Sequence, residues 1–183
     1  MKVMVVYSSP NKDGLTAACA NAAAEGVRQA GGEAELVCLN DLQIAHCYSC
    51  QDGWGKCRSE HECGRPDEFQ PLHQRMREFD AFALVTPVYW GQPSEYMKAF
   101  CDRLRRCEAT AGAKGYFRDR SIIAVAAAGG SGNGTITCLL EMENWIKHVG
   151  ALPYDLITVK RWTRPFKLEA IKASARAMAE GKR

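Results

Sequence analysis

Residues 81–93 read Ala-Phe-Ala-Leu-Val-Thr-Pro-Val-Tyr-Trp-Gly-Gln-Pro, and residues 94–103 continue as Ser-Glu-Tyr-Met-Lys-Ala-Phe-Cys-Asp-Arg. The first part is a short apolar run that stops at Pro87, shows two aromatic residues and a glycine, and then gives way to a helical pattern. A buried strand that ends in such a turn and leads into a helix is typical of the ligand-binding edge of an open α/β sheet. The stretch therefore predicts that residues 87–91 lie against a flat aromatic ligand.

The rest of the chain alternates between apolar runs and helical patterns. Five strands are predicted, at residues 2–7, 34–39, 81–86, 121–127 and 154–159, and five helices, at residues 15–30, 67–79, 93–107, 135–148 and 165–179. Pro93 is expected to be the first helical residue of its segment, a position that proline favours. Strands that alternate with helices form parallel sheets through right-handed crossovers. The sequence therefore predicts a doubly wound α/β fold, a five-stranded parallel sheet with helices on both faces in a three-layer sandwich.

Length and charge narrow the class of protein. The 183 residues suit one domain, and the net charge of +3 is too small to indicate a nucleic-acid or membrane partner. Arg103, Arg105 and Arg106 form the one basic group, which we interpret as the solvated face of a helix; attraction of an anionic nicotinamide nucleotide is the alternative. No apolar stretch is long enough to cross a bilayer, and no signal peptide is visible, so a cytoplasmic protein is expected.

A turn rich in hydroxyl groups follows the first strand. Residues 8–16 read Ser-Ser-Pro-Asn-Lys-Asp-Gly-Leu-Thr and lead directly into a predicted helix. The free backbone N–H groups and partial positive charge of a helix start suit a phosphate, although an ordinary capped turn has the same composition. The segment matches neither the GxxxxGK[ST] loop nor the GxGxxG motif. A nucleoside triphosphate site and an ordinary dinucleotide-binding domain are therefore not indicated.

A third loop follows the predicted strand 121–127. Residues 129–134 read Gly-Gly-Ser-Gly-Asn-Gly, so a ligand there would contact mainly backbone. By itself such a loop is also consistent with a flexible turn. All three loops are expected at the carboxyl edge of the sheet. Together they predict one site with a phosphate at residues 8–16, a ring at residues 87–91, and backbone contacts at residues 129–134.

These segments resemble the NADPH-dependent FMN reductase and flavodoxin-like oxidoreductase family, over residues 2 to about 150. The resemblance implies a single flavodoxin-like domain (1–183) that binds FMN without a covalent bond, is reduced by NADPH or NADH, and forms a homodimer or a higher homo-oligomer. Many relatives carry Asn where Leu15 stands. No side chain is required as an acid or base, because the flavin carries the hydride chemistry. The implied FMN contacts are Ser9, Pro10, Asn11, Gly14, Leu15, Thr16, Pro87, Val88, Tyr89, Trp90, Gly91, Gly129, Gly130 and Gly132.

Nine cysteines occur in the chain, and in a reducing compartment they are more consistent with thiols or metal ligands than with disulfides. Five have core-like surroundings (Cys19, Cys38, Cys101, Cys107 and Cys138). The other four lie in a long loop, residues 40–66, and are Cys47, Cys50, Cys57 and Cys63. Such thiols could bind zinc or an iron–sulfur cluster, or remain free and sensitive to oxidation. Iron–sulfur flavoprotein relatives have a third cysteine where this chain has Gly53.

Three functions are consistent with these features. The leading hypothesis is an FMN-dependent NAD(P)H oxidoreductase of the flavin or quinone reductase type, with a small-molecule or protein electron acceptor. The second is an iron–sulfur flavoprotein that carries electrons between FMN and a cluster on Cys47–Cys63. The third is a non-catalytic binding module with structural zinc. Trp145 and Trp162 are expected to be packing or interface residues rather than cofactor contacts.

Overall fold

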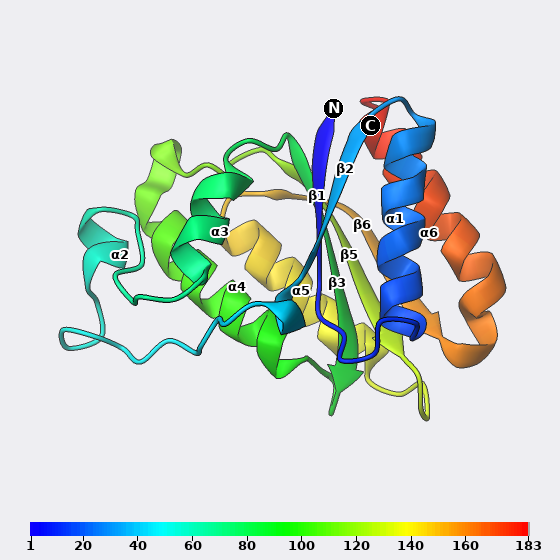
Figure 1. Cartoon of the computed structure of the whole chain (residues 1–183), viewed down its shortest axis with the longest axis horizontal. Helices are drawn as coiled ribbons and strands as arrows, with labels where there is room; N and C mark the ends of the chain where they lie inside the picture. Colours follow the sequence, from blue (N-terminus) through cyan, green and yellow to red (C-terminus); the bar gives the residue numbers. More distant parts are fainter. Residues whose placement is uncertain (183) are drawn as a thin grey trace.

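A computed structural model describes residues 1–182 and shows a parallel sheet in the centre of the molecule (Figure 1). The five long strands run in the order β2-β1-β3-β5-β6, and each neighbouring pair is parallel. This arrangement confirms the predicted doubly wound fold. Apolar side chains cover both faces of the central strands, which explains their continuous hydrophobic sequences. The strands are β1 (Lys2–Tyr7), β2 (Glu33–Cys38), β3 (Ala81–Tyr89), β5 (Ser121–Ala128) and β6 (Leu152–Lys160).

A short sixth strand, β4 (Gln92–Pro93), was not predicted. It folds back antiparallel on the end of β3, with Val88 opposite Pro93 and Tyr89 opposite Gln92. The prediction that Pro93 begins the following helix was wrong, because this hairpin uses it at a sheet edge, where its missing N–H is not needed. Helix α4 (Glu95–Glu108) instead begins after Ser94, whose Oγ accepts a hydrogen bond from the Met97 N–H at 3.3 Å.

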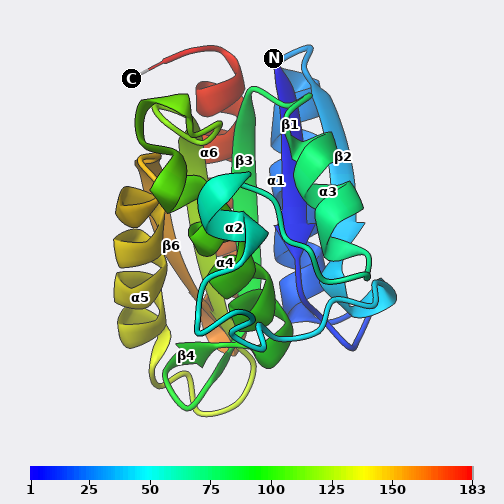
Figure 2. The same ribbon diagram turned by 90° about the vertical axis from the view of Figure 1, so that its left-hand side faces the viewer.

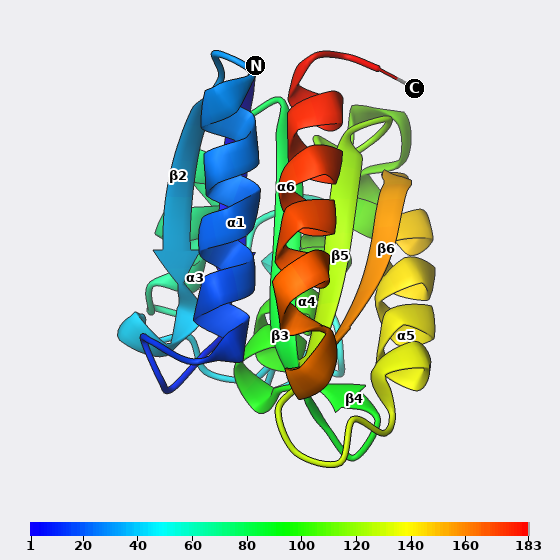
Figure 3. The ribbon, with the colours of Figure 1, turned by 90° about the vertical axis from the view of Figure 1, so that its right-hand side faces the viewer.

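The helices form a layer on each face of the sheet. Figure 3 shows α1 (Leu15–Gln29) and α6 (Arg164–Ala179) side by side on one face. The other face is covered by α3 (Phe69–Met76), α4 and α5 (Thr135–His148), as Figure 2 shows from the opposite side. Each layer packs on its own apolar core, so the three-layer sandwich is confirmed. The short elements are η1 (Leu39–Asp41), α2 (Lys56–Ser59), η2 (Ala109–Lys114) and η3 (Arg161–Thr163).

A buried histidine–glutamate pair joins α3 to the end of α4. The His73 Nε2 atom lies 2.6 Å from Glu108 Oε1, and Glu108 Oε2 accepts the Tyr116 N–H at 2.6 Å. Burial alone would raise the pKa of the Glu108 carboxyl. The hydrogen bond and charge of His73, with the N–H groups of Phe117 and Tyr116, outweigh burial and hold that pKa below its ordinary value of 4.5.

This pair predicts a loss of stability in acid. A carboxyl group whose pKa is lower in the folded chain stabilises it above the unfolded pKa, and that contribution disappears as the pH falls through the folded pKa. The free energy of unfolding of the apoprotein, measured by urea titration, should therefore decline as the pH drops below about 4.5. Glu108→Gln should flatten this decline, whereas Glu33→Gln, at an exposed carboxylate, should not. An identical acid profile for Glu108→Gln would contradict the assignment.

Candidate functional site

The three predicted loops lie together at one edge of the sheet. Strands β1, β3 and β5 are neighbours and parallel, so the segments that follow them emerge at the same edge (Figure 3). Below this edge three buried hydroxyl groups connect the first loop to the second. Ser94 Oγ donates to Ser8 Oγ at 2.8 Å, and the Ser94 N–H donates to Thr86 Oγ1 at 3.0 Å. The loops are thus fixed relative to one another before any ligand binds.

The start of α1 fits an anionic group. Gly14 is the N-cap residue, and within residues 1–182 no side chain caps the helix there; the first turn also lacks an acidic residue. The loop is shaped by its own bonds, since Ser9 Oγ and the Gly14 N–H both donate to the Asn11 carbonyl, at 2.7 and 3.2 Å. The N–H groups of the first turn are therefore available to an external acceptor, and the helix dipole favours a negative one.

The hairpin after β3 presents its aromatic residues to solvent. The Trp90 side chain is fully exposed and that of Tyr89 is 44 % exposed, which is unusual for aromatic residues beside a buried strand. Trp90 and Gly91 both have positive φ angles, 52° and 78°, so they form the tight turn of the hairpin. Neither Tyr89 nor Trp90 is therefore part of the apolar core.

A hollow of about 550 Å³ lies between this hairpin and the glycine-rich loop. The backbones meet closely at its base, since a Cβ atom at Gly134 would lie 2.6 Å from the Cα atom of Gly91. By contrast, a Cβ atom at Gly129 or Gly130 would have no neighbour within 4 Å, so their backbone faces open space. A flat ring can approach peptide groups there without meeting a side chain. The hollow is lined by Val88, Trp90, Gly91, residues 128–134 and Thr137.

A second hollow, of about 230 Å³, separates the hairpin from the first loop. Among the described residues Asn40 is notable, because its Oδ1 atom is buried and has no hydrogen-bond partner. A buried polar atom without a partner is costly, and a bound polar ligand would relieve it. The lining residues are Ser8, Pro10, Asn40, Pro87, Tyr89, Ser94, Glu95 and Tyr96.

The structure thus gathers the predicted FMN contacts around two hollows, which the β3–β4 hairpin borders, and one helix start. Val88, Trp90, Gly91, Gly129, Gly130 and Gly132 line the larger hollow, and Pro10, Pro87 and Tyr89 line the smaller. Ser9, Asn11, Gly14, Leu15 and Thr16 form the loop and first turn of α1. Sequence reasoning missed Asn40, Ser94 and Thr137. Asn40 lies in η1, two residues after the end of β2, and since β2 neighbours β1 at the same edge, the strand order contained a signal for it.

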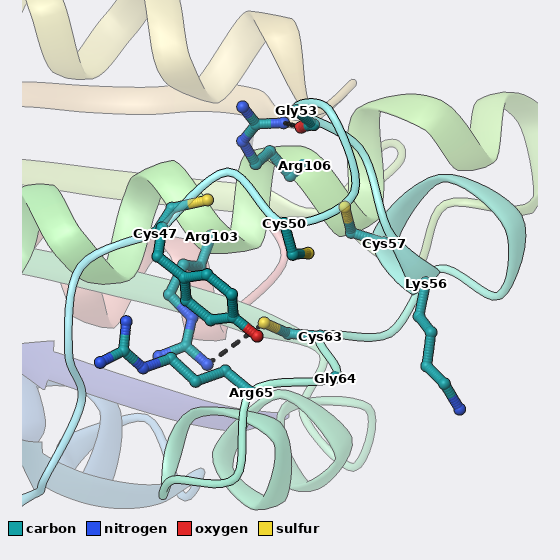
Figure 4. A pocket seen from close by; sticks show the side chains of 11 residues that line it. Cys47, Cys50, Gly53, Lys56, Cys57, Cys63, Gly64, Arg65, Arg103 and Arg106 are labelled. Atoms are coloured by element: carbon teal, nitrogen blue, oxygen red, sulfur yellow. Dashed lines mark hydrogen bonds between the residues drawn. The ribbon is translucent and has the colours of Figure 1, made fainter.

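The cysteine loop forms a separate site beside α4. Cys47, Cys50, Cys57 and Cys63 all line one cavity, although they are up to 16 positions apart (Figure 4). The cavity is narrow, with about 20 Å³ open to a water-sized sphere. In residues 1–182 no three His, Cys, Asp or Glu side chains are arranged to hold a metal ion. The thiols suit a soft metal chemically, but the arrangement described here does not hold one.

Arg103 lies beneath this cavity and is 1 % exposed. Its guanidinium group donates to both Asp67 oxygens, at 2.6 and 2.8 Å, and to Cys63 Sγ at 3.2 Å. It also stacks on the Phe69 ring, 4.3 Å from the ring centroid. Burial by itself would raise the pKa of the Asp67 carboxyl, but Arg103 and two backbone N–H groups hold that pKa below its ordinary value. The cation therefore ties α4 to the loop.

The interpretation of the arginines as a solvated helix face was wrong for Arg103 and Arg106. Arg106 donates to the Gly53 carbonyl at 2.6 Å (Figure 4). It also stacks 4.5 Å from the Trp54 ring centroid. Both arginines hold the cysteine loop, because a loop with little secondary structure needs side-chain donors for its carbonyl groups. Trp145 is buried and donates to the Cys101 carbonyl at 2.8 Å, which confirms it as a packing residue.

The sequence matches the family model of the NADPH-dependent FMN reductases over residues 1–159. The chain belongs to this family. The match confirms the resemblance inferred from the sequence, to a family of flavin-dependent oxidoreductases. Within the described residues no helix is long and apolar enough to span a membrane.

Curated relatives of this FMN reductase family chain include iron–sulfur flavoproteins. One from Methanosarcina thermophila is 29% identical over 137 residues, which are 73% of this chain and 66% of that protein. One from Archaeoglobus fulgidus is 26% identical over 175 residues, or 96% and 83% of the two chains. The first three curated relatives are spanned only in part, to 66%, 46% and 52% of their lengths.

Solved structures show the same fold. An NAD(P)H:quinone oxidoreductase from Methanothermobacter marburgensis superposes with a TM-score of 0.74 at 18% identity, covering 97% of this chain and 96% of that one. A flavodoxin from the domain Archaea gives a TM-score of 0.67 at 16% identity, with 99% and 98% covered. At these identities the likeness establishes the flavodoxin-like fold.

Proposed function

We propose that this chain is an FMN-dependent NAD(P)H oxidoreductase that passes electrons from a nicotinamide nucleotide to a small-molecule or protein acceptor. The whole chain, residues 1–183, would act as one FMN-binding domain. A cytoplasmic setting fits its nine free thiols, which a reducing compartment would keep from forming disulfides. A homodimer or a higher homo-oligomer is the oligomeric state we expect.

One observation supports this proposal most strongly. An uncapped helix start, a hollow beside exposed Tyr89 and Trp90, and a backbone-lined loop adjoin at one edge of the sheet. These three features match three parts of FMN. The helix start would bind the phosphate, the hollow beside the aromatic residues would hold the flat ring, and the backbone-lined loop would meet the ring edge that is rich in hydrogen-bonding atoms. The family match over residues 1–159 and the quinone oxidoreductase fold are consistent with the same ligand.

The residues present would divide the work of binding and orientation. The first-turn N–H groups of α1 would hold the phosphate, and the hydroxyl groups of Ser9 and Thr16 lie close by in sequence. Tyr89 and Trp90 would cover the ring and exclude water from it, while the peptide groups of residues 129–132 would bind its polar edge. When bound, FMN supplies the hydride and electron transfer, so no side chain is assigned as an acid or base.

Loss of the aromatic pair should weaken FMN binding. Stacking of a base on an aromatic side chain contributes about 1–3 kcal/mol, so replacing Tyr89 and Trp90 together with Ala should raise the Kd of FMN by about 10- to 100-fold. Flavin fluorescence quenching measures this Kd. Tyr48→Ala, at an exposed aromatic residue of the cysteine loop, should leave it unchanged. An unchanged Kd in the double variant would place the ring elsewhere.

The function itself is tested by reconstitution. Protein loaded with FMN should oxidise NADPH or NADH under anaerobic conditions in the presence of a quinone, followed by the loss of nicotinamide absorbance. Heat-denatured protein with the same FMN serves as the control for free-flavin chemistry. Protein that binds no FMN, or that binds it and oxidises neither nucleotide, would contradict the proposal.

An iron–sulfur flavoprotein is the second candidate, because all four loop thiols line one cavity and relatives carry that name. Cys47, Cys50, Cys57 and Cys63 would then bind the cluster, after the loop opens beyond its present narrow cavity. Iron and sulfide analysis of anaerobically purified protein tests this candidate. A zinc module, the third hypothesis, has no support from the geometry, since no three ligand side chains in the described residues meet at a point.

A further inference from the structure

A basic and aromatic segment borders the proposed flavin site and has no role in it so far. Residues 160–167 read Lys-Arg-Trp-Thr-Arg-Pro-Phe-Lys, with four cations and no acidic residue. They follow β6 and begin α6, and therefore lie at the same edge of the sheet as the three loops. We call residues 160–167 the β6–α6 turn.

Two hydrogen bonds close the turn, and its cations form no ion pair within residues 1–182. The Lys160 N–H donates to Thr163 Oγ1 at 2.9 Å, and this hydroxyl donates back to the Lys160 carbonyl at 3.1 Å. Within residues 1–182 neither lysine nor either arginine of the turn forms an ion pair. The nearest carboxylate in sequence, Glu169, pairs with Lys172 at 3.2 Å. An anionic ligand would therefore meet uncompensated positive charge.

The turn also presents two aromatic rings, each 61 % exposed, at Trp162 and Phe166. Trp162 packs against the glycine-rich loop, since a Cβ atom at Gly132 would lie 2.7 Å from its ring and 3.0 Å from the Lys160 side chain. Gly132 in turn lines the 550 Å³ hollow. A ligand that enters this hollow can thus extend directly onto an exposed indole ring flanked by cations.

The turn lies near the start of α1 as well. Figure 3 shows α6, which begins at Arg164, beside α1, with the first turns of both helices at the same edge of the sheet. The charge of Arg164 also lowers the pKa of the Cys19 thiol on α1, although burial is the larger effect and raises that pKa to about 12. The cations therefore extend from the glycine-rich loop toward the first turns of α1. Their spread suits a ligand with more than one phosphate better than a compact anion.

We propose that the β6–α6 turn binds the adenine nucleotide half of NADPH, with Trp162 against the base and Arg161 and Arg164 on the phosphates. The proposal rests on the function proposed above and adds the residues that would select NADPH over NADH. In Rossmann-type sites a carboxylate binds the ribose 2′-hydroxyl of NADH, whereas an arginine accommodates the 2′-phosphate of NADPH, and the same charge argument applies here. The turn offers arginines and no carboxylate. An acidic protein acceptor is the competing occupant, but charge alone would attract it and the exposed rings beside the hollow would not be needed.

The experiment uses FMN-loaded protein and three variants. These are Arg161→Gln/Arg164→Gln, Trp162→Ala, and a control, Arg77→Gln/Lys114→Gln, which removes two exposed charges at the opposite edge of the sheet. The Kd of NADP⁺ is measured by titration at low salt, together with the Kd of FMN and kcat/KM for NADPH and NADH. Loss of two charged contacts should raise the Kd of NADP⁺ by about tenfold or more. Trp162→Ala should raise the Kd of NADP⁺ by a similar factor, and the control variant should leave this Kd unchanged.

The outcomes separate the two proposals. Support consists of weaker NADP⁺ binding in the turn variants, an unchanged FMN Kd, and a fall in kcat/KM that is larger for NADPH than for NADH. An unchanged NADP⁺ Kd in the turn variants would overturn this inference but not the proposed function. A matching rise in the FMN Kd also overturns it, since the turn would then serve the flavin phosphate. Wild-type protein that holds FMN but binds neither NADP⁺ nor NAD⁺ would overturn the nicotinamide part of the proposed function, and the inference with it.

Discussion

Replacing Gly14 with Asp should leave the fold as stable as the wild type and yet weaken FMN binding about 100-fold. Gly14 is an N-cap residue with φ −74° and ψ 179°, a conformation in which aspartate is a preferred cap. Its carboxylate would accept the first-turn N–H groups of α1 and complement the helix dipole. The same carboxylate would occupy the phosphate site and repel the phosphate. Since charged hydrogen bonds contribute about 1.5–3 kcal/mol, we expect the FMN Kd to rise about 100-fold.

The control for this change is Gly14→Ser, which offers a neutral cap of similar size. The serine variant should bind FMN much more tightly than the aspartate variant, because it competes for N–H groups without adding charge. The closest contact for either side chain is the Asn11 carbonyl, 3.3 Å from a Cβ atom at this position, so both require a similar small adjustment. Equal FMN affinities for Gly14→Asp and wild type would place the phosphate away from α1.

Replacing Arg103 with Met should cost about 3–5 kcal/mol of unfolding free energy, because removing one partner of a buried ion pair leaves the other charge uncompensated. Asp67 would lose both guanidinium bonds, and the Ala45 carbonyl would lose a donor at 3.0 Å. Lysine should not rescue the variant, since an ammonium group cannot reproduce the two-pronged contact with Asp67. Urea unfolding of the apoprotein measures the loss.

Two further variants make this prediction specific. Arg105→Met removes a charge from a more exposed position of the same helix and should change stability by about 0.5 kcal/mol or less. Arg103→Met combined with Asp67→Asn should recover part of the loss, because the buried carboxylate is then gone. A loss below about 1 kcal/mol in Arg103→Met would mean that the pair contributes little to the fold.

The sheet and the three loops were predictable because their signals are local. Continuous apolar runs identify buried parallel strands, and the turn chemistry after β1, β3 and β5 identifies the edge where ligands bind. The observed helix α5 has the predicted bounds, and the five cysteines assigned to the core are all buried. The local sequence was sufficient there, because each of these segments carries a continuous apolar run or an apolar helix face that has to be buried in the core.

The remaining features depend on contacts between distant residues. Arg103 was interpreted as a surface cation because acidic residues, Asp102 and Glu108, lie near it in the sequence. Its actual partner, Asp67, lies 36 positions away. Pro93 was predicted to begin a helix because no nearby residue indicates that β3 continues to Tyr89 and that the chain then folds back to pair with it as β4. Trp162 was interpreted as a packing or interface residue, and its exposed ring is not packed in the core, which no local pattern indicates because aromatic residues are more often buried.

The most direct test of the flavin site is residue-resolved. FMN is titrated into ¹⁵N-labelled apoprotein, and the amide resonances are followed by two-dimensional NMR. We predict that the largest shifts occur at Leu15 and Thr16 from the phosphate and at Gly91, Gly129 and Gly130 from the ring, with the cysteine loop, residues 47–63, nearly unmoved. Shifts confined to the cysteine loop, or saturation by FMN without any shift at Leu15 and Thr16, would contradict the three-loop site.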